Sequence, residues 1–510
     1  RVNSMLTLIV FTPLIGALAL LFVNKDDAGT VRNISVGAAG FTFLVSLVLV
    51  SRFDSSLQAM QFTETLAWVP MFHINYQVGV DGISLWLVVL TAFISLIAVC
   101  FSLDRQVGFR NFMALLLALE AGTLGVFVAL DLILFYVFWE LMLVPTYFLI
   151  GIWGEGRRVY ATTKFVLYTL VGSLLMLLAI IWLSLIHFEV THEFSFDIQT
   201  LVHMKIDPAD QVWLFLFFLS AFAIKIPIFP LHSWLPHAYI SSPIPVLLIL
   251  TGAMSKAGAY GIIRFCLPLF PDAVDKFGLV IAFGAATGIV YGAWIAIAQR
   301  DLKALVAYSS ISHLGFIALG IFALNGEGIE GSVLQMVNHG IIASALFIIV
   351  GILEKKMGTR NLNDFRGLGK AMPLLYGMFM LVTLAALGLP GLNGFVGEFL
   401  ILMGVWTSLV LADLSAIYVL MGGLSIVFAA IYMLYMFQGA MQEKNDHIPE
   451  GLTDINFREF GLLLPACVLV VLIGLYPKPF IDRVSPSVES ILTLEKTINL
   501  HAGEDKGGHH

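Results

Sequence analysis

The chain has 510 residues, of which 59% are hydrophobic and 12% are charged, and its formal net charge is −7. Soluble domains contain about 25% charged residues, and a nucleic-acid-binding surface is basic. With a mean hydropathy of +0.93, the composition therefore excludes a soluble globular enzyme, a disordered chain and a nucleic-acid binder. It indicates a polytopic membrane protein, in which each helix needs about 20 apolar residues to cross the bilayer.

Fourteen apolar segments follow one another along the chain. They are too long for barrel strands, and an open sheet edge cannot lie in hydrocarbon, so we predict an all-α protein with about 14 transmembrane helices. The first segment lacks a small-residue cleavage site, which favours a retained helix over a signal peptide. The predicted spans are 6–23, 31–51, 82–102, 112–130, 132–153, 165–187, 211–235, 243–267, 275–298, 302–324, 331–353, 373–404, 410–438 and 460–480.

The basic residues are distributed unevenly between the two sides of this arrangement. An even number of spans places both termini on one side, where the loops contain only Arg52, Lys205 and Lys276. The loops on the opposite side contain sixteen Lys and Arg residues. Because basic loops stay in the cytoplasm, we predict that both termini lie on the non-cytoplasmic side.

Two of the predicted spans contain helix-breaking residues. The seventh contains Pro227, Pro230 and Pro236, and the twelfth has a run of glycines. Each proline removes a backbone donor, and interrupted spans at matching positions are typical of inverted-repeat transporters. We predict breaks at 225–230 and 388–394, although ordinary kinked helices are the alternative. The predicted organisation is an N-terminal three-helix segment (1–111), a first five-helix repeat with helices 4–8 (112–267), an inverted second repeat with helices 9–13 (275–440), and a C-terminal helix and tail (460–510).

Four ionisable residues lie deep inside apolar spans: Glu140, Lys225, Lys256 and Glu398. Each charge costs about 2.5–3.5 kcal/mol on insertion scales, so together they require pairing or hydration. The alternative to a functional role is helix–helix pairing, but buried ion pairs stabilise weakly compared with apolar packing. The pattern therefore favours a proton relay.

A lysine paired with a glutamate suits such a relay. Burial favours the neutral lysine and a nearby carboxylate favours the charged one. At about 4 Å and an effective dielectric of about 20, the pair interacts by about 4 kcal/mol. Moving a proton against 100 mV requires about 2.3 kcal/mol, so the pair is strong enough to switch. We expect Glu140 and Lys225 to lie within direct or water-bridged hydrogen-bond reach.

Histidines supply further candidate relay groups. His339 lies mid-span between Lys256 and Glu398 in the sequence, as does His313, and imidazole titrates near neutral pH. We place His339 in the main set and treat His313, Glu120 and His232 as secondary candidates, since single buried histidines are often core groups.

The three cysteines, Cys100, Cys266 and Cys467, are far apart and form no CxxC pair. They therefore do not indicate a disulfide framework, an iron–sulfur cluster or a zinc site. We predict no metal site and no cofactor-binding site in this chain.

Several motifs are similar to those of the antiporter-like membrane subunits of respiratory complex I, which are related to multisubunit cation/proton antiporters. The resemblance covers nearly the whole chain. It is carried by Val80-Asp-Gly-Ile-Ser-Leu, Phe138-Trp-Glu-Leu-Met-Leu-Val-Pro, Lys225-Ile-Pro, His232-Ser-Trp-Leu-Pro, Asp301-Leu-Lys-Ala-Leu-Val-Ala-Tyr-Ser-Ser-Ile-Ser-His-Leu-Gly and Gly394-Phe-Val-Gly-Glu-Phe-Leu.

The resemblance implies fourteen helices, two inverted repeats and broken helices seven and twelve. It implies that Glu140 and Lys225 form a first pair, and that Lys256 and His339 pass protons to an exit at Glu398. One branch of the family has glutamate at this last position, whereas the L and N subunits have lysine. Glu398 therefore places the chain in the glutamate branch, as does the absence of the extra helices that extend the L subunit.

One stretch departs from the family pattern. The family usually has an acid and a histidine after Trp-Leu-Pro, where this chain has His237 and Tyr239 and continues to Pro243-Ile-Pro245. No family role is carried over to these two positions. The change affects the cytoplasmic side of the first half-channel.

The function that follows is proton translocation as a subunit of NADH:quinone oxidoreductase. The alternatives are a subunit of a multisubunit sodium/proton antiporter, a subunit of a proton-pumping membrane hydrogenase, and a structural spacer. The resemblance implies L-like and N-like membrane partners and a peripheral arm in which NAD, FMN, iron–sulfur clusters and quinone are bound. It also implies an energy-conserving membrane, which we predict to be a bacterial inner membrane.

Overall fold

The structure is a computed structural model that describes residues 4–442 and 451–504, with side chains up to residue 494. In this part of the chain, twelve helices are long and apolar enough to span a membrane. The shorter helix Met5–Leu21 and the interrupted pair Pro373–Ala386 and Asn393–Thr407 supply two more apolar crossings. The predicted polytopic helical fold is therefore confirmed, and each of the fourteen predicted segments corresponds to a helix or a broken helix.

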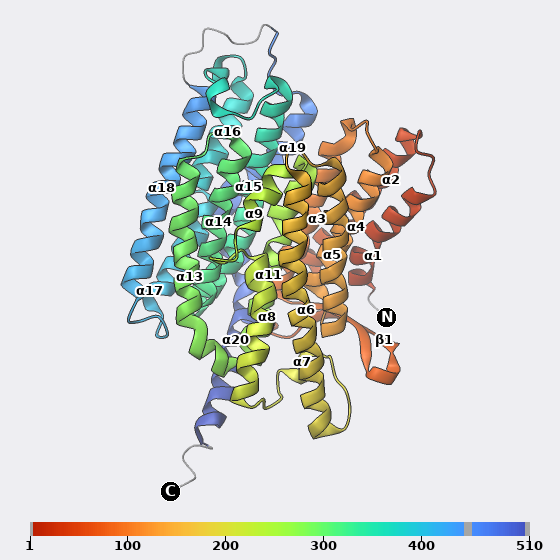
Figure 1. Ribbon diagram of the computed structural model, residues 1–510, viewed down its shortest axis with the longest axis vertical. Helices are drawn as coiled ribbons and strands as arrows, with labels where there is room; N and C mark the ends of the chain where they lie inside the picture. Colours follow the sequence, from red (N-terminus) through yellow and green to blue (C-terminus); the bar gives the residue numbers. More distant parts are fainter. Residues whose placement is uncertain (1–3, 443–450, 505–510) are drawn as a thin grey trace.

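The helices lie roughly along the long axis of the molecule (Figure 1). The N-terminal part and the first group of five spans comprise α1 (Met5–Leu21), α2 (Ala28–Arg52), α3 (Gly82–Phe101), α4 (Phe109–Val128), α5 (Leu132–Trp153), α6 (Arg158–Thr191), α7 (Ile198–Leu201), α8 (Pro208–Lys225), α9 (Trp234–Ser241), α10 (Ile244–Ile249), α11 (Lys256–Gly261) and α12 (Leu267–Leu269).

The remaining helices form the second group and the C-terminal part. They are α13 (Pro271–Ile297), α14 (Leu302–Ile321), α15 (Gly326–Met357), α16 (Pro373–Ala386), α17 (Asn393–Thr407), α18 (Ser415–Met441), α19 (Phe457–Leu475) and α20 (Lys478–Glu504). The connections rich in Lys and Arg, such as 298–301 and 358–372, lie at the upper end in Figure 1, which we call the basic end. The helix α20 runs towards the lower end.

A β-hairpin is the exception to the all-helical prediction. Strands β1 (Gln61–Val69) and β2 (Ile74–Val80) pair antiparallel in the connection between α2 and α3. Val78 and Val80 are fully buried, and the amide of Leu130 donates to the carbonyl of Gln77. The hairpin thus closes the lower end of the bundle over the turn between α4 and α5.

Both predicted breaks are present, with slightly shifted bounds. The seventh span is interrupted at residues 226–233, between α8 and α9, and the twelfth at 387–392, between α16 and α17. Pro236 lies inside α9 and does not break it. In the second break Gly388 and Gly391 have φ values of +78° and +93°, which only glycine adopts without strain. Each break lies between two helical halves of its span (Figure 1).

The eighth span is irregular around Lys256. It contains two π-helical segments, 250–254 and 262–266, on either side of α11. The π-helix is rare and is found frequently at functional sites. The span packs tightly against α8, because a Cβ at Gly258 would lie 2.5 Å from the Phe222 carbonyl oxygen and 2.8 Å from the Ile226 nitrogen.

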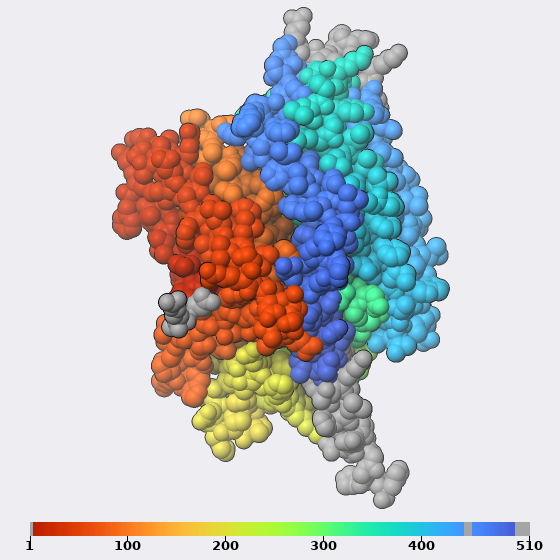
Figure 2. Space-filling view, turned by 180° about the vertical axis from the view of Figure 1, so that it is seen from behind, coloured from red at the N-terminus to blue at the C-terminus, as the bar shows by residue number. Residues whose placement is uncertain are grey.

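The C-terminal segment, predicted as a helix followed by a polar tail, contains a second long helix, α20. Figure 2 shows the blue C-terminal segment running between the N-terminal part and the second group of helices. Val484, Val488 and Ile491 are buried at spacings of four and three residues, which form one helical stripe. The Ser487 hydroxyl accepts from the Gly82 amide at 2.9 Å. The other face of α20 carries polar residues such as Asp482 and Glu489, so the helix is less apolar than the membrane spans.

Substituting Gly258 tests the close packing of α11 against α8. Gly258→Ala forces the two backbones apart, and we expect a loss of about 1–3 kcal/mol, which is typical of overpacking. The matched control is Gly37→Ala in α2, where an added Cβ meets nothing within 4 Å. Thermal unfolding of the purified assembly measures the stability of both variants. Equal melting temperatures for the two variants would contradict the packing described here.

Candidate functional site

A buried line of polar side chains runs from α11, in the eighth span, into the second group of helices. It begins at Lys256, which is 0% exposed. The Lys256 ammonium donates to the Thr251 carbonyl and, at 3.3 Å, to the Ser255 hydroxyl. It also forms a 2.8 Å hydrogen bond with Nδ1 of His339 on α15. The ammonium therefore has three acceptors in a span that otherwise offers hydrocarbon.

The line continues through a second histidine to the carboxylate. The rings of His339 and His313 have centroids 5.7 Å apart. His313 on α14 forms a 2.9 Å hydrogen bond through Nδ1 with Oε1 of Glu398. The Gln335 amide donates to the same oxygen at 3.3 Å. Glu398 is 4% exposed, so this carboxyl group is held by a histidine and an amide inside the bundle.

The irregular backbone positions both ends of this line. Lys256 is the first residue of α11, and only Ser255 separates it from a π-helical segment. Glu398 lies in the second turn of α17, which begins after the break at 387–392. An added Cβ at Gly388, within that break, would lie 3.1 Å from Glu398 Oε2. The break therefore lies directly against the carboxyl group.

The side chains of the first predicted pair, Glu140 and Lys225, are not directly bonded to each other. Lys225 ends α8 and is 1% exposed. Its ammonium lies 5.1 Å from the ring centroid of Trp139 and 5.7 Å from that of Phe165. No direct hydrogen bond or ion pair joins it to Glu140, which nevertheless acts on it electrostatically. Glu140 lies beside the Tyr136 hydroxyl, and its Oε1 has no hydrogen-bond partner among the described residues.

Two secondary candidates lie outside the line. His232, in the first break, stacks on Phe229 with a centroid distance of 5.2 Å and meets Tyr291 of α13 at 4.8 Å. Glu120 is fully buried on α4, and neither of its oxygens has a hydrogen-bond partner in the described part of the chain. The third candidate, His313, is the direct partner of Glu398. His313, which was only a secondary candidate from the sequence, is thus a central member of the buried line.

The sequence interpretation missed a buried ion pair between Asp81 and Arg264. Nη2 of Arg264 lies 2.7 Å from Oδ2 of Asp81, and both side chains are less than 10% exposed. Asp81 also accepts from the amides of Ile83 and Ser84 and so caps α3. An arginine near the end of the apolar run 243–267 was the available signal.

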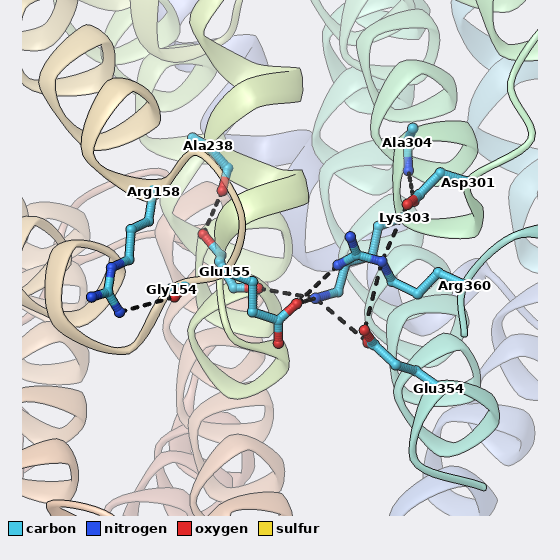
Figure 3. Close-up of polar contacts among 10 residues, drawn as sticks. Gly154, Glu155, Arg158, Ala238, Asp301, Lys303, Ala304, Glu354 and Arg360 are labelled. Carbon is cyan, nitrogen blue, oxygen red and sulfur yellow. Dashed lines mark hydrogen bonds and ion pairs between the residues drawn. The ribbon is translucent and has the colours of Figure 1, made fainter. Parts of the chain in front are cut away.

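A second cluster that the sequence did not indicate lies at the basic end (Figure 3). Lys303 appeared to be a loop lysine, but its side chain is 0% exposed. Its ammonium lies 3.2 Å from Glu155 Oε2 and 3.6 Å from Glu354 Oε2. Arg360 contacts Glu155 at 2.9 Å and Asp301 at 3.2 Å. The cluster ties the connection between α5 and α6 to α14 and α15.

Comparisons with known proteins agree with this architecture. Residues 129–425 match the family model described as NADH:quinone oxidoreductase/Mrp antiporter, TM. The chain is 36% identical to NADH-quinone oxidoreductase subunit M of Rhodobacter capsulatus, covering 96% of both chains. It is 37% identical to NADH-ubiquinone oxidoreductase chain 4 of Chondrus crispus, covering 96% of this chain and 98% of that one.

Among solved structures, the chain resembles one in respiratory complex I from Thermus thermophilus with bound NADH. The TM-score is 0.87 at 31% identity, covering 97% of this chain and 100% of that one. The fold and the buried polar line define an antiporter-like membrane subunit, and the chain belongs to the NADH:quinone oxidoreductase/Mrp antiporter family. The two relatives above are named subunit M and chain 4, which confirms the branch predicted from Glu398.

Breaking the buried ion pair tests its structural contribution. Asp81→Asn retains a capping group but leaves Arg264 as an unpaired buried charge, and breaking such pairs costs about 3–5 kcal/mol. Asp482→Asn removes the partner of Lys478 in an exposed pair, which contributes about 0.3–0.5 kcal/mol within a helix. Thermal unfolding of the assembled protein should show a large loss for the first variant only. Similar melting temperatures for both would show that the buried pair is dispensable.

Proposed function

We propose that this chain translocates protons across the membrane as a subunit of NADH:quinone oxidoreductase. The observation that carries the proposal is the buried line Lys256–His339–His313–Glu398, in which two hydrogen bonds flank a close approach of the two histidine rings. Its members come from four helices, α11, α15, α14 and α17, and all of them are groups that exchange protons. The names of the relatives support the redox partner, because both are subunits of NADH-oxidising quinone reductases.

Each member of the line has a role in the proposed transfer. Lys256 releases a proton to Nδ1 of His339, with which it shares a hydrogen bond. An imidazole accepts a proton on one nitrogen and releases one from the other. His339 therefore passes the proton to the neighbouring ring of His313. His313 then delivers the proton to Glu398. Glu398, beside the second break, is the proposed exit group.

The pair Glu140 and Lys225 is the proposed control element of the first half. Lys225 lies between two aromatic rings rather than on its carboxylate partner. If Glu140 moved into direct contact with the ammonium, the two charges would attract each other by about 4 kcal/mol. Since Gly258 packs against the backbone of α8 beside Lys225, such a change acts near Lys256.

The proposed organisation consists of two inverted repeats, 112–267 and 275–440, flanked by 1–111 and 460–510. Two features support it: the broken span is the fourth of each repeat, and α8 leads upward to α9 whereas α16 leads downward to α17 (Figure 1). We place both termini on the non-cytoplasmic side of a bacterial inner membrane, since the basic loops lie at the opposite end.

The proposed assembly includes L-like and N-like membrane subunits and a peripheral arm with NAD, FMN, iron–sulfur clusters and quinone. The second candidate is a subunit of an Mrp-type antiporter, because the family description includes both kinds of protein. Co-purification separates the two: NADH-binding and iron–sulfur subunits should accompany the tagged chain. Their absence from an intact assembly would favour the antiporter.

Substitution of Glu398 tests the exit group. Glu398→Gln and Glu398→Ala remove the titrating group, and because positioned proton donors contribute about 100-fold or more, we expect NADH-driven pumping to fall at least about tenfold. Glu398→Lys can still carry a proton and should keep part of the activity. Reconstituted vesicles give the rates, and native gels check assembly.

The control for this test is Glu327→Gln, at the start of α15 and outside the line. It should pump at the unaltered rate. An assembled Glu398→Ala complex that pumps at the same rate as this control would make Glu398 a structural residue.

A further inference from the structure

A cavity of about 200 Å³ lies at the lower end of the molecule, where α7 and α20 approach each other (Figure 1). Its lining includes the exposed residues Gln58, Gln199 and His203. It also includes Asp81 and Arg264, which are only 3% and 6% exposed. The cavity therefore leads from solvent to the buried ion pair.

Beyond the ion pair, the eighth span leads to the start of the buried line. Lys256, Tyr260 and Arg264 follow one another at intervals of four residues, a spacing that places side chains on one face of a helix. Nε of Arg264 donates to the Tyr260 hydroxyl at 3.3 Å, and the guanidinium carbon lies 5.3 Å from the centroid of the Tyr260 ring. Eight residues of helix rise about 12 Å, so Arg264 and Tyr260 separate the cavity from Lys256 over a short distance.

The direction of the proposed transport makes this separation important. Protons are delivered to the non-cytoplasmic side, which is the lower end, and the membrane potential drives them back. A pump that exports protons loads Lys256 from the cytoplasmic side. A conducting connection between the cavity and Lys256 would therefore return protons to the line and dissipate the gradient.

The chemistry of the two intervening side chains opposes such a connection. A proton moves along a chain of groups only if each one can both accept and donate. A guanidinium has N–H donors and no acceptor, and it stays protonated in proteins. The Tyr260 hydroxyl accepts from Arg264 and donates to the Phe127 carbonyl at 3.2 Å. Both of its hydrogen-bonding roles are therefore occupied.

Two helices hold the guanidinium in this position. Oδ2 of Asp81 lies 2.7 Å from Nη2 of Arg264, and Oδ1 of Asp81 accepts from two amides in the first turn of α3. The helix α20 packs directly against the adjacent backbone, because an added Cβ at Gly82 would overlap the Arg483 carbonyl. The carboxylate is thus fixed by α3 and α20, and it fixes Arg264 at the inner end of the cavity.

We propose that Arg264 is a proton barrier between the lower-end cavity and Lys256. The guanidinium prevents water in the cavity from passing a proton to Tyr260, and Asp81 is the residue that positions it. The proposal rests on the proposed function for the direction of transport. It adds a role for the ion pair, which lies outside the buried line.

Replacing Arg264 by a group that relays protons tests the barrier. Arg264→His introduces an imidazole, which accepts and donates, whereas Arg264→Met fills the position with a group that does neither. Each is combined with Asp81→Asn, which keeps a capping group and leaves no unpaired buried charge. Vesicles that contain the assembled complex receive an imposed pH gradient without NADH, and a trapped pH dye reports proton entry. Native gels check assembly.

The histidine variant should admit protons at least about tenfold faster than the methionine variant, because a positioned proton carrier contributes about 100-fold or more. The unaltered complex and the methionine variant should stay proton-tight. Equal proton entry in the two variants would overturn the proposal. If both leak, the ion pair is a packing seal, and if neither leaks, the cavity does not communicate with Lys256.

A single substitution provides the same comparison if the double variants do not assemble. In Arg264→His alone, Asp81 can still pair with a protonated imidazole, and proton entry should again exceed that of the unaltered complex. Because the gradient is imposed, this measurement does not depend on NADH-driven pumping. An unaltered complex that is proton-tight but does not pump would refute the proposed function, whereas one that pumps beside a tight Arg264→His complex would refute only the barrier.

Discussion

A charged side chain in the hydrocarbon layer has no water to solvate it, and the interior of this protein is arranged around that constraint. Three solutions are visible. The Lys256 ammonium forms hydrogen bonds with a backbone carbonyl, a hydroxyl and an imidazole. Lys225 lies against two aromatic faces, and Arg264 has a full carboxylate partner. The first two leave the charge weakly held, as a proton carrier requires, whereas the third fixes it. In the proposed mechanism, the strength of the pairing thus separates proton-carrying groups from structural ones.

Irregular backbone makes these weakly held positions available. A continuous α-helix satisfies its own carbonyls, but a π-helical turn or a break leaves some free to bind side chains. The Thr251 carbonyl, within a π-helical segment, accepts from Lys256, and the Trp234 indole donates to the Ile224 carbonyl beside the first break. The break at 387–392 lies against Glu398. The side chains proposed to carry protons and the backbone irregularities therefore occur together in spans eight and twelve.

Much of this architecture can be predicted from the sequence, because helix-length apolar runs, prolines and glycines are local signals. The order of the spans and the two breaks follow from them, and the family branch follows from Glu398. The pairs of polar side chains that meet across the bundle cannot be predicted from these local signals. Lys256 and His339 are 83 residues apart, and His313 and Glu398 are 85 apart, so their pairing depends on how α14, α15 and α17 are rotated. The burial of Lys303 cannot be predicted for the same reason, because its position in the sequence suggests a loop.

The number of protons translocated per NADH oxidised, measured in vesicles with the assembled His313→Leu complex, tests the central claim most directly. His313 contacts both His339 and Glu398, and leucine fills a similar volume without a titratable group. The account predicts a lower ratio than in the unaltered complex, because the line is cut while assembly is retained. An unchanged ratio at full assembly would contradict transfer along Lys256, His339, His313 and Glu398.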